Sequence, residues 1–313
     1  MKKLVVVVPC YNEEAVLNET IFRLNKKYED LFSKNIISKE SLILYVDDGS
    51  KDSTWSIITM AHQNNPTNIG LKLSRNFGHQ NALIAGLLKA KNLGDCIISM
   101  DADLQDDINA LDAFLEKYDQ GFEIVYGVRN KRIKDSVFKR NSAELFYHLM
   151  KLLGVDLVFN HADYRLMSQR ALNLLEQYEE VNLFIRGIVP TIGLKSTTVF
   201  YDREKRFAGE SKYPLFKMLS FAFEGVTSFS IKPIRMIFSV GVSMMVVSIL
   251  IILYTLVRYF DGQTVTGWAF LNISLWFVAG VQTFLLGVVG EYVGKSYSEI
   301  KKRPRYLIET ELI

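Results

Sequence analysis

The chain has 313 residues and a mass of 35.8 kDa, which suits one large domain with an additional segment. Hydrophobic residues make up 49% of it and the mean hydropathy is +0.11, which is high for a soluble protein. The formal net charge of +3 is too small to indicate nucleic-acid binding, and two cysteines without metal-type spacing exclude a disulfide framework.

Strands and helices are predicted to alternate over the first 130 residues. The run at 4–8 is apolar and β-branched, which is typical of a strand buried on both faces of a parallel sheet. Alternation with short connections favours an α/β domain with a doubly wound, mostly parallel sheet, whose ligands bind at the carboxyl ends of the strands. Further strands are predicted at 42–46, 71–73, 96–100 and 124–126, with helices at 13–32, from 54 onward and at 80–93.

Four of these strands are followed by polar clusters, which are expected to converge at one edge of the sheet. The most acidic cluster follows the strand at 96–100. There Asp101 and Asp103 flank one small residue, so both carboxylates can face a single hard cation. A solvated acidic turn that caps the next helix explains an isolated Asp-x-Asp motif equally well. The four clusters lie at 9–14, 47–52, 75–79 and 101–107.

The pattern after residue 130 is mixed at first and then strongly apolar. Aromatic, aliphatic and charged residues at 211–232 suit an amphipathic helix in the membrane interface. Residues 236–257 and 262–290 carry no charge over 22 and 29 residues. Each run exceeds the roughly 20 apolar residues needed to cross a bilayer. Before these runs we expect helices at 136–153 and 170–177, a polar turn with a short strand at 159–167, a strand at 197–201, and a loop at 203–213.

The two uncharged runs predict a transmembrane hairpin with spans at about 234–258 and about 267–291. Lysines and arginines flank the hairpin before the first span and after the second, whereas the connecting loop holds one arginine and one aspartate. Both termini are therefore expected in the cytoplasm, and the protein in the plasma (inner) membrane. Small residues along the spans offer faces for packing in a homo-oligomer. The expected division is a cytoplasmic domain at 1–210, the interfacial helix at 211–232 and the hairpin with a basic tail at 233–313.

Five motifs in a fixed order extend across the domain: residues 8–13 (Val-Pro-Cys-Tyr-Asn-Glu), 46–52 (Val-Asp-Asp-Gly-Ser-Lys-Asp), 74–80 (Ser-Arg-Asn-Phe-Gly-His-Gln), 100–106 (Met-Asp-Ala-Asp-Leu-Gln-Asp) and 206–213 (Arg-Phe-Ala-Gly-Glu-Ser-Lys-Tyr). Together with two C-terminal spans they resemble the membrane-anchored, polyprenyl-phosphate glycosyltransferases of family 2, which have the GT-A fold. Each motif alone is weak evidence for the family, but five motifs in the order that the family shows do not match by chance. The resemblance covers essentially the whole chain.

The resemblance implies a role for each matching position. Mg²⁺ or Mn²⁺ on the donor diphosphate would be held by Asp101, Asp103 and Gln105. The acceptor phosphate would be bound by Arg129, Arg206, Ser211 and Lys212. Asp101, Asp103, Asp163 and Arg206 would take part in catalysis. The nucleotide would be bound by Pro9, Tyr11, Asn12, Glu13, Asp47, Asp48, Asp101 and Ala102.

The implied reaction is an inverting transfer of a sugar from a UDP-sugar to undecaprenyl phosphate at the cytoplasmic face of the lipid bilayer. Glucose is the first expectation and N-acetylglucosamine the second. A phosphate monoester has its second pKa near 6, so the acceptor is already mostly dianionic and needs cations more than a strong base. Asp163 would orient the acceptor or act as a base. A carboxylate beside a phosphate is repulsive unless it is protonated or bridged, for example by a metal or Arg165.

Other functions fit the sequence less well. A transporter would need more than two spans and an ionisable residue within them. A phosphatase that uses Asp-x-Asp would carry the motif after the first strand, and a processive polysaccharide synthase would carry a Gln-x-x-Arg-Trp motif that is absent here. A catalytically silent, membrane-tethered nucleotide-sugar-binding protein would keep the same aspartates. His79 and His161 are expected to be hydrogen-bonded structural residues rather than ligands.

Overall fold

The structure is a computed structural model that describes residues 1–129, 161–180, 185–202 and 268–313, together with seven single positions between 234 and 250. The sheet and its helices form one compact unit, which also includes the C-terminal residues after 302, and α10 belongs to a second unit. The strands are β1 (Leu4–Cys10), β2 (Leu42–Asp47), β3 (Asn68–Leu73), β4 (Cys96–Ser99), β5 (Ile124–Arg129), β6 (His161–Ser168), β7 (Ser196–Tyr201) and β8 (Ile308–Leu312). The helices are α1 (Leu17–Ser33), α2 (Thr54–Asn64), α3 (His79–Ala90), α4 (Ala110–Asp119), α6 (Gln169–Leu175), α7 (Ile185–Thr191) and α10 (Trp268–Lys301).

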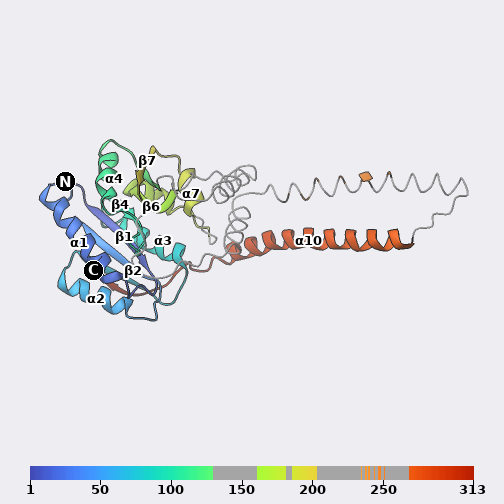
Figure 1. The fold of residues 1–313 in the computed structure, drawn as a ribbon, viewed down its shortest axis with the longest axis horizontal. Coiled ribbons are helices and arrows are strands. Elements are labelled where there is room, and N and C mark those ends of the chain that lie inside the picture. The colour runs from blue at the N-terminus through green and yellow to red at the C-terminus, as the bar shows by residue number, and fades with distance from the viewer. Residues whose placement is uncertain are drawn as a thin grey trace, which may run out of the picture. The chain divides into compact units, whose positions relative to one another are not determined.

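The eight strands form one mixed sheet in the order β7-β5-β6-β4-β1-β2-β3-β8 (Figure 1). The pairs β1–β2, β1–β4, β2–β3 and β5–β7 are parallel, so the expected α/β domain with a mostly parallel sheet is confirmed. The antiparallel pairs β4–β6, β5–β6 and β3–β8 were not expected. The sheet is therefore mixed rather than purely doubly wound.

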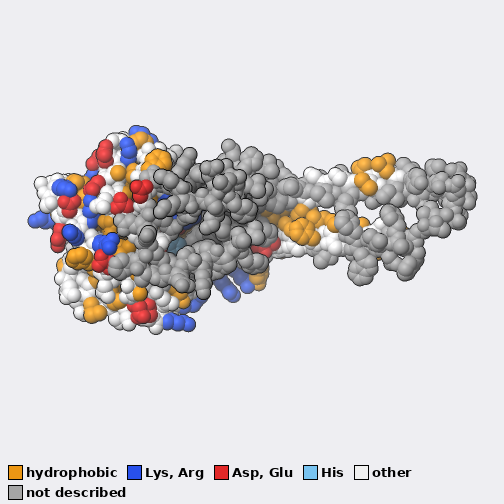
Figure 2. Space-filling model, in the orientation of Figure 1, with side chains coloured by type: hydrophobic (Ala, Val, Ile, Leu, Met, Phe, Trp, Pro, Cys, Tyr) orange, Lys and Arg blue, Asp and Glu red, His pale blue; other side chains and the backbone are white. Residues whose placement is uncertain are grey.

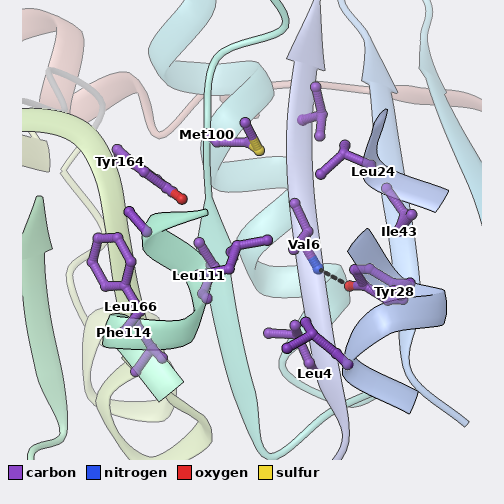
Figure 3. Close-up of a cluster of buried hydrophobic side chains, with 14 of the residues drawn as sticks. Leu4, Val6, Leu24, Tyr28, Ile43, Met100, Leu111, Phe114, Tyr164 and Leu166 are labelled. Carbon is purple, nitrogen blue, oxygen red and sulfur yellow. Dashed lines mark hydrogen bonds between the residues drawn. The ribbon is translucent and has the colours of Figure 1, made fainter. Parts of the chain in front are cut away.

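Strand β1 is buried on both faces, as its apolar run predicts. Leu4, Val6 and Val8 belong to the main core cluster, together with side chains of α1 and α4 (Figure 3). Val7 points to the opposite face, where α3 packs so closely that a Cβ on Gly86 would lie 2.4 Å from Val7 Cγ1. Helices on both faces thus fix β1 at the centre of the sheet, and with it the loops that follow the neighbouring strands.

A polar link inside this core joins β1 to α1. The Tyr28 hydroxyl accepts a hydrogen bond from the Val6 backbone N–H at 3.2 Å and donates to the Leu42 carbonyl at 2.7 Å (Figure 3). Both partners satisfy the buried hydroxyl, which would otherwise cost free energy in an apolar environment. Helix α1 is therefore held in register with β1 and β2.

The C-terminal tail contains a strand that the sequence pattern did not indicate. Residues 303–313 were expected to be a basic tail, but β8 pairs with β3 in antiparallel register. Lys72 forms an ion pair with Glu309 at 2.8 Å, and the Ser74 N–H donates to the Leu307 carbonyl at 2.9 Å. The strand thus covers the edge of β3 just before the 75–79 cluster.

The predicted membrane segments lie largely outside the described residues. The interfacial helix at 211–232 falls wholly outside them, and so does most of the first span at 234–258. The second span at 267–291 overlaps α10. Within the residues that the structure covers, no helix has both the length and the apolar character of a membrane span.

Charged side chains of both signs are interspersed over the visible, described face of the sheet-containing unit (Figure 2). A surface that binds nucleic acid through phosphate contacts instead gathers lysines and arginines in one stripe or patch. This distribution agrees with the small net charge of +3.

Candidate active site

The loops that follow β1 and β2 are hydrogen-bonded to each other. The Asn12 N–H donates to Ser50 Oγ at 2.9 Å, and the Lys51 N–H donates to Asn12 Oδ1 at 2.9 Å. The Glu13 N–H donates to Thr54 Oγ1 at 2.9 Å. Asn12 has φ 54°, a left-handed conformation that asparagine tolerates better than most residues. The structure therefore brings the two predicted nucleotide-binding loops together, as the sequence predicts.

Within these loops, the predicted nucleotide-binding residues differ in accessibility. Pro9 lies inside buried β1, whereas Tyr11 is 42% exposed and can reach a ligand. Asp47 is fully buried; its Oδ1 accepts the Ser50 N–H at 3.1 Å, and its Oδ2 has no hydrogen-bond partner. Burial raises the pKa of Asp47. In this conformation Asp47 holds the turn after β2 and does not present a carboxylate to the surface.

Asp48 organises the loop that follows β3. Its Oδ1 accepts the Phe77 N–H at 2.7 Å, and its Oδ2 accepts the Gly78 N–H at 2.9 Å. Burial raises the pKa of Asp48, and the two N–H groups oppose that shift because they stabilise the charged form. The predicted nucleotide-binding carboxylate therefore also positions the 75–79 cluster, and this link was not visible in the sequence.

Gly49 permits the close approach of these two loops, and replacing it provides a test. Its φ is +65°, and a Cβ there would lie 2.3 Å from the Arg75 carbonyl carbon and 2.6 Å from the Asn76 nitrogen. We expect Gly49→Ala to raise the KM for the nucleotide sugar about tenfold, because the Arg75–Asn76 backbone must move away.

Gly121→Ala is the matched control for Gly49→Ala. Gly121 has φ +80°, but a Cβ there meets nothing within 4 Å, so the variant carries the backbone strain without the clash. The strain alone costs about 1 kcal/mol. Steady-state kinetics and thermal unfolding of both variants should therefore show a KM change for Gly49→Ala only. Equal KM values in the two variants would contradict the proposed loop contact.

The turn after β4 is held by the core of the domain. The Thr20 hydroxyl, on α1 and fully buried, donates to the Ala102 carbonyl at 2.8 Å. Leu104 is 3% exposed and has φ 57°, which is uncommon for a branched apolar residue. This reversal allows the Gln105 N–H to donate to Asp103 Oδ1 at 3.1 Å. The turn with the two predicted metal-binding aspartates is thus fixed rather than a loose acidic loop.

The donor chemistry of this turn fits a divalent metal ion. The pKa of Asp101 is raised to about 6, mainly by burial and also by the neighbouring carboxylates of Asp106, Asp163 and Asp103, while the charge of His79 opposes the shift. A cation would relieve this crowding of carboxylates. Mg²⁺ is usually held by one or two carboxylates together with substrate phosphates, so Asp101 and Asp103 suffice on the protein side. In the described ranges, no group of three or more histidines, cysteines, aspartates or glutamates is arranged to hold a metal ion.

Asp163 on β6 lies at the centre of a charged cluster next to Asp101. Its Oδ1 accepts from Arg165 Nη2 at 2.7 Å and from Arg186 Nε at 3.1 Å, and its Oδ2 accepts from Arg186 Nη2 at 2.9 Å. His79 Nε2 lies 3.5 Å from Asp163 Oδ2 and 3.8 Å from Asp101 Oδ1. His79 therefore lies between the two predicted catalytic carboxylates, and its expected role as a hydrogen-bonded structural residue stays a prediction.

The cluster favours an ionised Asp163 and a protonated His79. Burial opposes ionisation of Asp163, but the His79 hydrogen bond and the charges of Arg186 and Arg165 hold its pKa well below the ordinary value. Burial likewise opposes protonation of His79, but the hydrogen bond with Asp163 and the negative charge of Asp101 raise its pKa above the ordinary value. The Asp163 carboxylate is thus bridged by arginine, which removes the repulsion expected between a bare carboxylate and a phosphate.

Arg186 is the member of this cluster that sequence reasoning missed. It lies on the short helix α7 and is the single charged residue between positions 181 and 194. A lone arginine in an apolar stretch is a signal, because arginine is almost never buried without a partner. Its partner, Asp163, is 23 positions earlier in the chain, and the sequence gives no indication of that contact.

Arg129 belongs to a second cluster, at the ends of β5 and β7. Its Nη2 donates to Asp106 Oδ1 at 3.3 Å and its Nε to the Tyr201 hydroxyl at 3.2 Å, while Tyr201 donates to Asp106 Oδ1 at 2.5 Å. Asp106 is 2% exposed. Arg129 thus ties both strand ends to the aspartate-rich turn, and its predicted contact with the acceptor stays a prediction. The other predicted acceptor residues, Arg206, Ser211 and Lys212, lie outside the described residues.

Comparison with known proteins identifies the family. Residues 5–175 match glycosyl transferase family 2, and residues 232–296 match the GtrB C-terminal hairpin. The uncharacterized glycosyltransferase YkoT of Bacillus subtilis is 52% identical over 309 residues, which cover 99% of this chain and 92% of YkoT. The prophage bactoprenol glucosyl transferase homolog of Escherichia coli K12 is 37% identical over 98% of each chain. The bactoprenol glucosyl transferase of Shigella phage SfII is 36% identical over 98% of this chain and 97% of its own. The chain therefore belongs to glycosyl transferase family 2 and is related along nearly its full length to bactoprenol glucosyl transferases.

Proposed function

We propose that the protein transfers a sugar from a UDP-sugar to undecaprenyl phosphate with inversion at the anomeric carbon. Glucose is the first candidate for this sugar. The observation that carries this proposal is the extent of the match to bactoprenol glucosyl transferases, which covers the α/β domain and the C-terminal hairpin together. A shared α/β domain alone would support many donors and acceptors. A lipid acceptor accounts for the hairpin as well.

We place the reaction at the cytoplasmic face of the plasma membrane. The match to the GtrB C-terminal hairpin supports a membrane association of residues 232–296, where two uncharged runs occur in the sequence. Basic residues on both outer sides of the hairpin favour cytoplasmic termini. The product, a lipid phosphosugar, would then be available for modification of cell-envelope glycans. Homo-oligomer formation through the hairpin stays a prediction.

On the donor side, the loops after β1 and β2 would bind the nucleotide, with Tyr11 exposed to pack against the base. Asp101 and Asp103 would hold Mg²⁺ or Mn²⁺, with Gln105 as a further predicted contact. Such a metal ion neutralises charge on the departing diphosphate. The fixed turn around Ala102 and Leu104 would keep both carboxylates in place without reorganisation during the reaction.

On the acceptor side, a phosphate oxygen of the lipid attacks the anomeric carbon while the bond from that carbon to the UDP oxygen breaks. UDP leaves with the bonding electron pair, and the new glycosyl phosphate bond has the inverted configuration. No proton must be removed from a dianionic phosphate, so the ion-paired Asp163 is not needed as a base. Arg206, Lys212 and Ser211 are proposed to bind the acceptor phosphate.

Release of UDP tests the proposed function. Purified full-length protein in detergent, with Mg²⁺ and undecaprenyl phosphate, is expected to release UDP from UDP-glucose and to produce a lipid-linked glucose. Parallel reactions with UDP-N-acetylglucosamine, UDP-galactose and GDP-mannose identify the sugar, and EDTA should stop the reaction until Mg²⁺ or Mn²⁺ is added in excess. If none of the donors releases its nucleotide, the proposed enzymatic activity is contradicted and a silent nucleotide-sugar-binding protein is favoured.

A further inference from the structure

We propose that the C-terminal strand β8 is a positioning element of the donor site. It holds the loop at 74–78, which joins β3 to α3, and through this loop the predicted nucleotide-binding turn after β2. The inference deepens the proposed function and rests on it, because it takes the loops after β1 and β2 as the nucleotide site. Neither the five motifs nor the two family matches, which end at residue 296, include β8.

The contact between β8 and β3 extends to the first residue of the loop. Leu73, the last residue of β3, is paired with Ile308 in the antiparallel register. The Ser74 N–H then donates to the Leu307 carbonyl at 2.9 Å. The C-terminal segment therefore fixes the point at which the chain leaves the sheet and enters the loop.

Ion pairs tie β8 to both elements that flank the loop. Lys72 on β3 pairs with Glu309 at 2.8 Å, and Lys89 in the last turn of α3 pairs with Glu311. Partly exposed pairs of this kind each contribute little to stability. Their placement matters here, because one pair lies on each side of the loop. β8 thus restrains β3 and α3 together, and with them the two ends of the loop.

Leu312 anchors β8 to the core of the domain. It is the one residue of β8 that is not exposed, and it packs against the main core cluster. Gly70 on β3 leaves the space for it, since a Cβ at this position would lie 3.2 Å from Leu312 Cδ1 and 2.9 Å from Ile58 Cγ2. A short edge strand with a single apolar anchor opens at a low free-energy cost. Replacing Leu312 should therefore detach β8 without unfolding the domain.

The loop in turn contacts the nucleotide-binding turn after β2. Asp48 is 2% exposed, and its carboxylate accepts the Phe77 N–H at 2.7 Å and the Gly78 N–H at 2.9 Å. Gly49 lies against the backbone of Arg75, so little space separates the loop from the turn. A displaced loop would leave a buried carboxylate without its donors, which is unfavourable. The loop and the nucleotide-binding turn are therefore expected to move together.

Detachment of β8 should weaken donor binding although β8 does not touch the donor. The apparent dissociation constant equals the intrinsic one divided by the fraction of molecules whose site is competent to bind. Loss of the restraint at Ser74 lowers that fraction. Once the donor is bound, the loop is ordered again, so the rate at saturating donor should change little. A positioning element thus predicts a change in KM and not in kcat.

Leu312→Asp in the full-length protein tests this role, because a carboxylate is not stable against the apolar core. Ile313→Asp is the matched control, since the neighbouring Ile313 is 65% exposed. In detergent with Mg²⁺, Leu312→Asp is expected to raise the dissociation constant for UDP and the KM for UDP-glucose about fivefold. Its kcat and its KM for undecaprenyl phosphate should stay within about twofold of the wild type. Ile313→Asp should leave all four values unchanged.

Glu309→Lys with Glu311→Lys is a second variant, which replaces both ion pairs by like charges. Adding Lys72→Glu and Lys89→Glu restores opposite charges and should recover UDP binding. Hydrogen exchange of residues 70–74 measures the detachment of β8 in each variant. The inference requires faster exchange and weaker UDP binding to occur together. Either change without the other, or neither change, in both Leu312→Asp and the lysine variant would overturn it.

The wild-type protein separates this inference from the proposed function. If it releases UDP from UDP-glucose while detachment of β8 leaves UDP binding unchanged, the positioning role alone is refuted. If it releases no nucleotide from any donor, the proposed function is refuted. The two failures are therefore distinguishable.

Discussion

Asp103→Asn is expected to lower the rate of sugar transfer about a thousandfold, which corresponds to roughly 4 kcal/mol of lost transition-state stabilisation. The substitution removes the negative charge that we propose for metal binding. It keeps a side-chain oxygen that can still accept the Gln105 N–H, so the turn after β4 should stay intact. A loss of turnover in this variant would therefore indicate impaired metal binding and not local unfolding of the turn.

Asp107→Asn provides the control in the same acidic segment. Its Oδ1 accepts the Asn109 N–H at 2.9 Å, a contact that an asparagine oxygen can keep. Initial rates over a Mg²⁺ titration should show near-normal turnover for Asp107→Asn, and for Asp103→Asn a deficit that persists at saturating donor. Normal turnover in Asp103→Asn would contradict the proposal that Asp103 binds the metal ion.

The part of the fold that the sequence predicts well is the part determined by local pattern. The strands β1, β2 and β4 are short apolar runs, and in each case a polar cluster begins within two residues of the end of the strand. The predicted end of β1 at residue 8 was wrong, because the strand continues through Pro9 to Cys10. The convergence of these clusters follows from parallel pairing with β1 in the centre. The loops that hold Asn12, Asp48 and Asp101 could therefore be placed at one edge of the sheet from the sequence alone.

Strand β8 shows where that reasoning stops. In the β8 sequence, Ile-Glu-Thr-Glu-Leu, the two acidic residues alternate with uncharged ones, but the strand is short and its burial is low. What makes it a strand is pairing with β3, more than 200 positions earlier, supported by ion pairs of Glu309 with Lys72 and of Glu311 with Lys89. Such long-range pairing leaves little local signal, because β propensity depends on the neighbouring strand.

The candidate site likewise divides into residues that the local sequence identifies and contacts that depend on long-range packing. The place directly after a strand named the carboxylates Asp101 and Asp103, because residue type and position can be read directly, and the resemblance to the family named Asp163. Their partners could not be named, because a side-chain contact depends on how α3 and α7 pack against β6. His79 and Arg186 contact Asp163 from 84 and 23 positions away, and those contacts determine the ionisation of the cluster.

Asp163→Ala is expected to lower the free energy of unfolding by about 3–5 kcal/mol, in addition to any loss of activity. The substitution leaves the fully buried Arg165 without the carboxylate at 2.7 Å that balances its charge. Thermal unfolding of the purified protein should show a clearly lower Tm. Glu19→Ala, which breaks the partly exposed Glu19–Arg23 pair, should change the stability by less than about 1 kcal/mol.

A double variant separates the structural role of Asp163 from its role in the site. Asp163→Ala with Arg165→Met removes both buried charges and replaces the guanidinium by an apolar side chain, which is often neutral or stabilising. We expect the Tm to return close to that of the wild type, while sugar transfer stays impaired because Arg186 and His79 have still lost the carboxylate that they contact. Recovery of both stability and turnover would mean that Asp163 serves only to neutralise Arg165. Recovery of stability alone would show that the carboxylate itself is needed for the reaction.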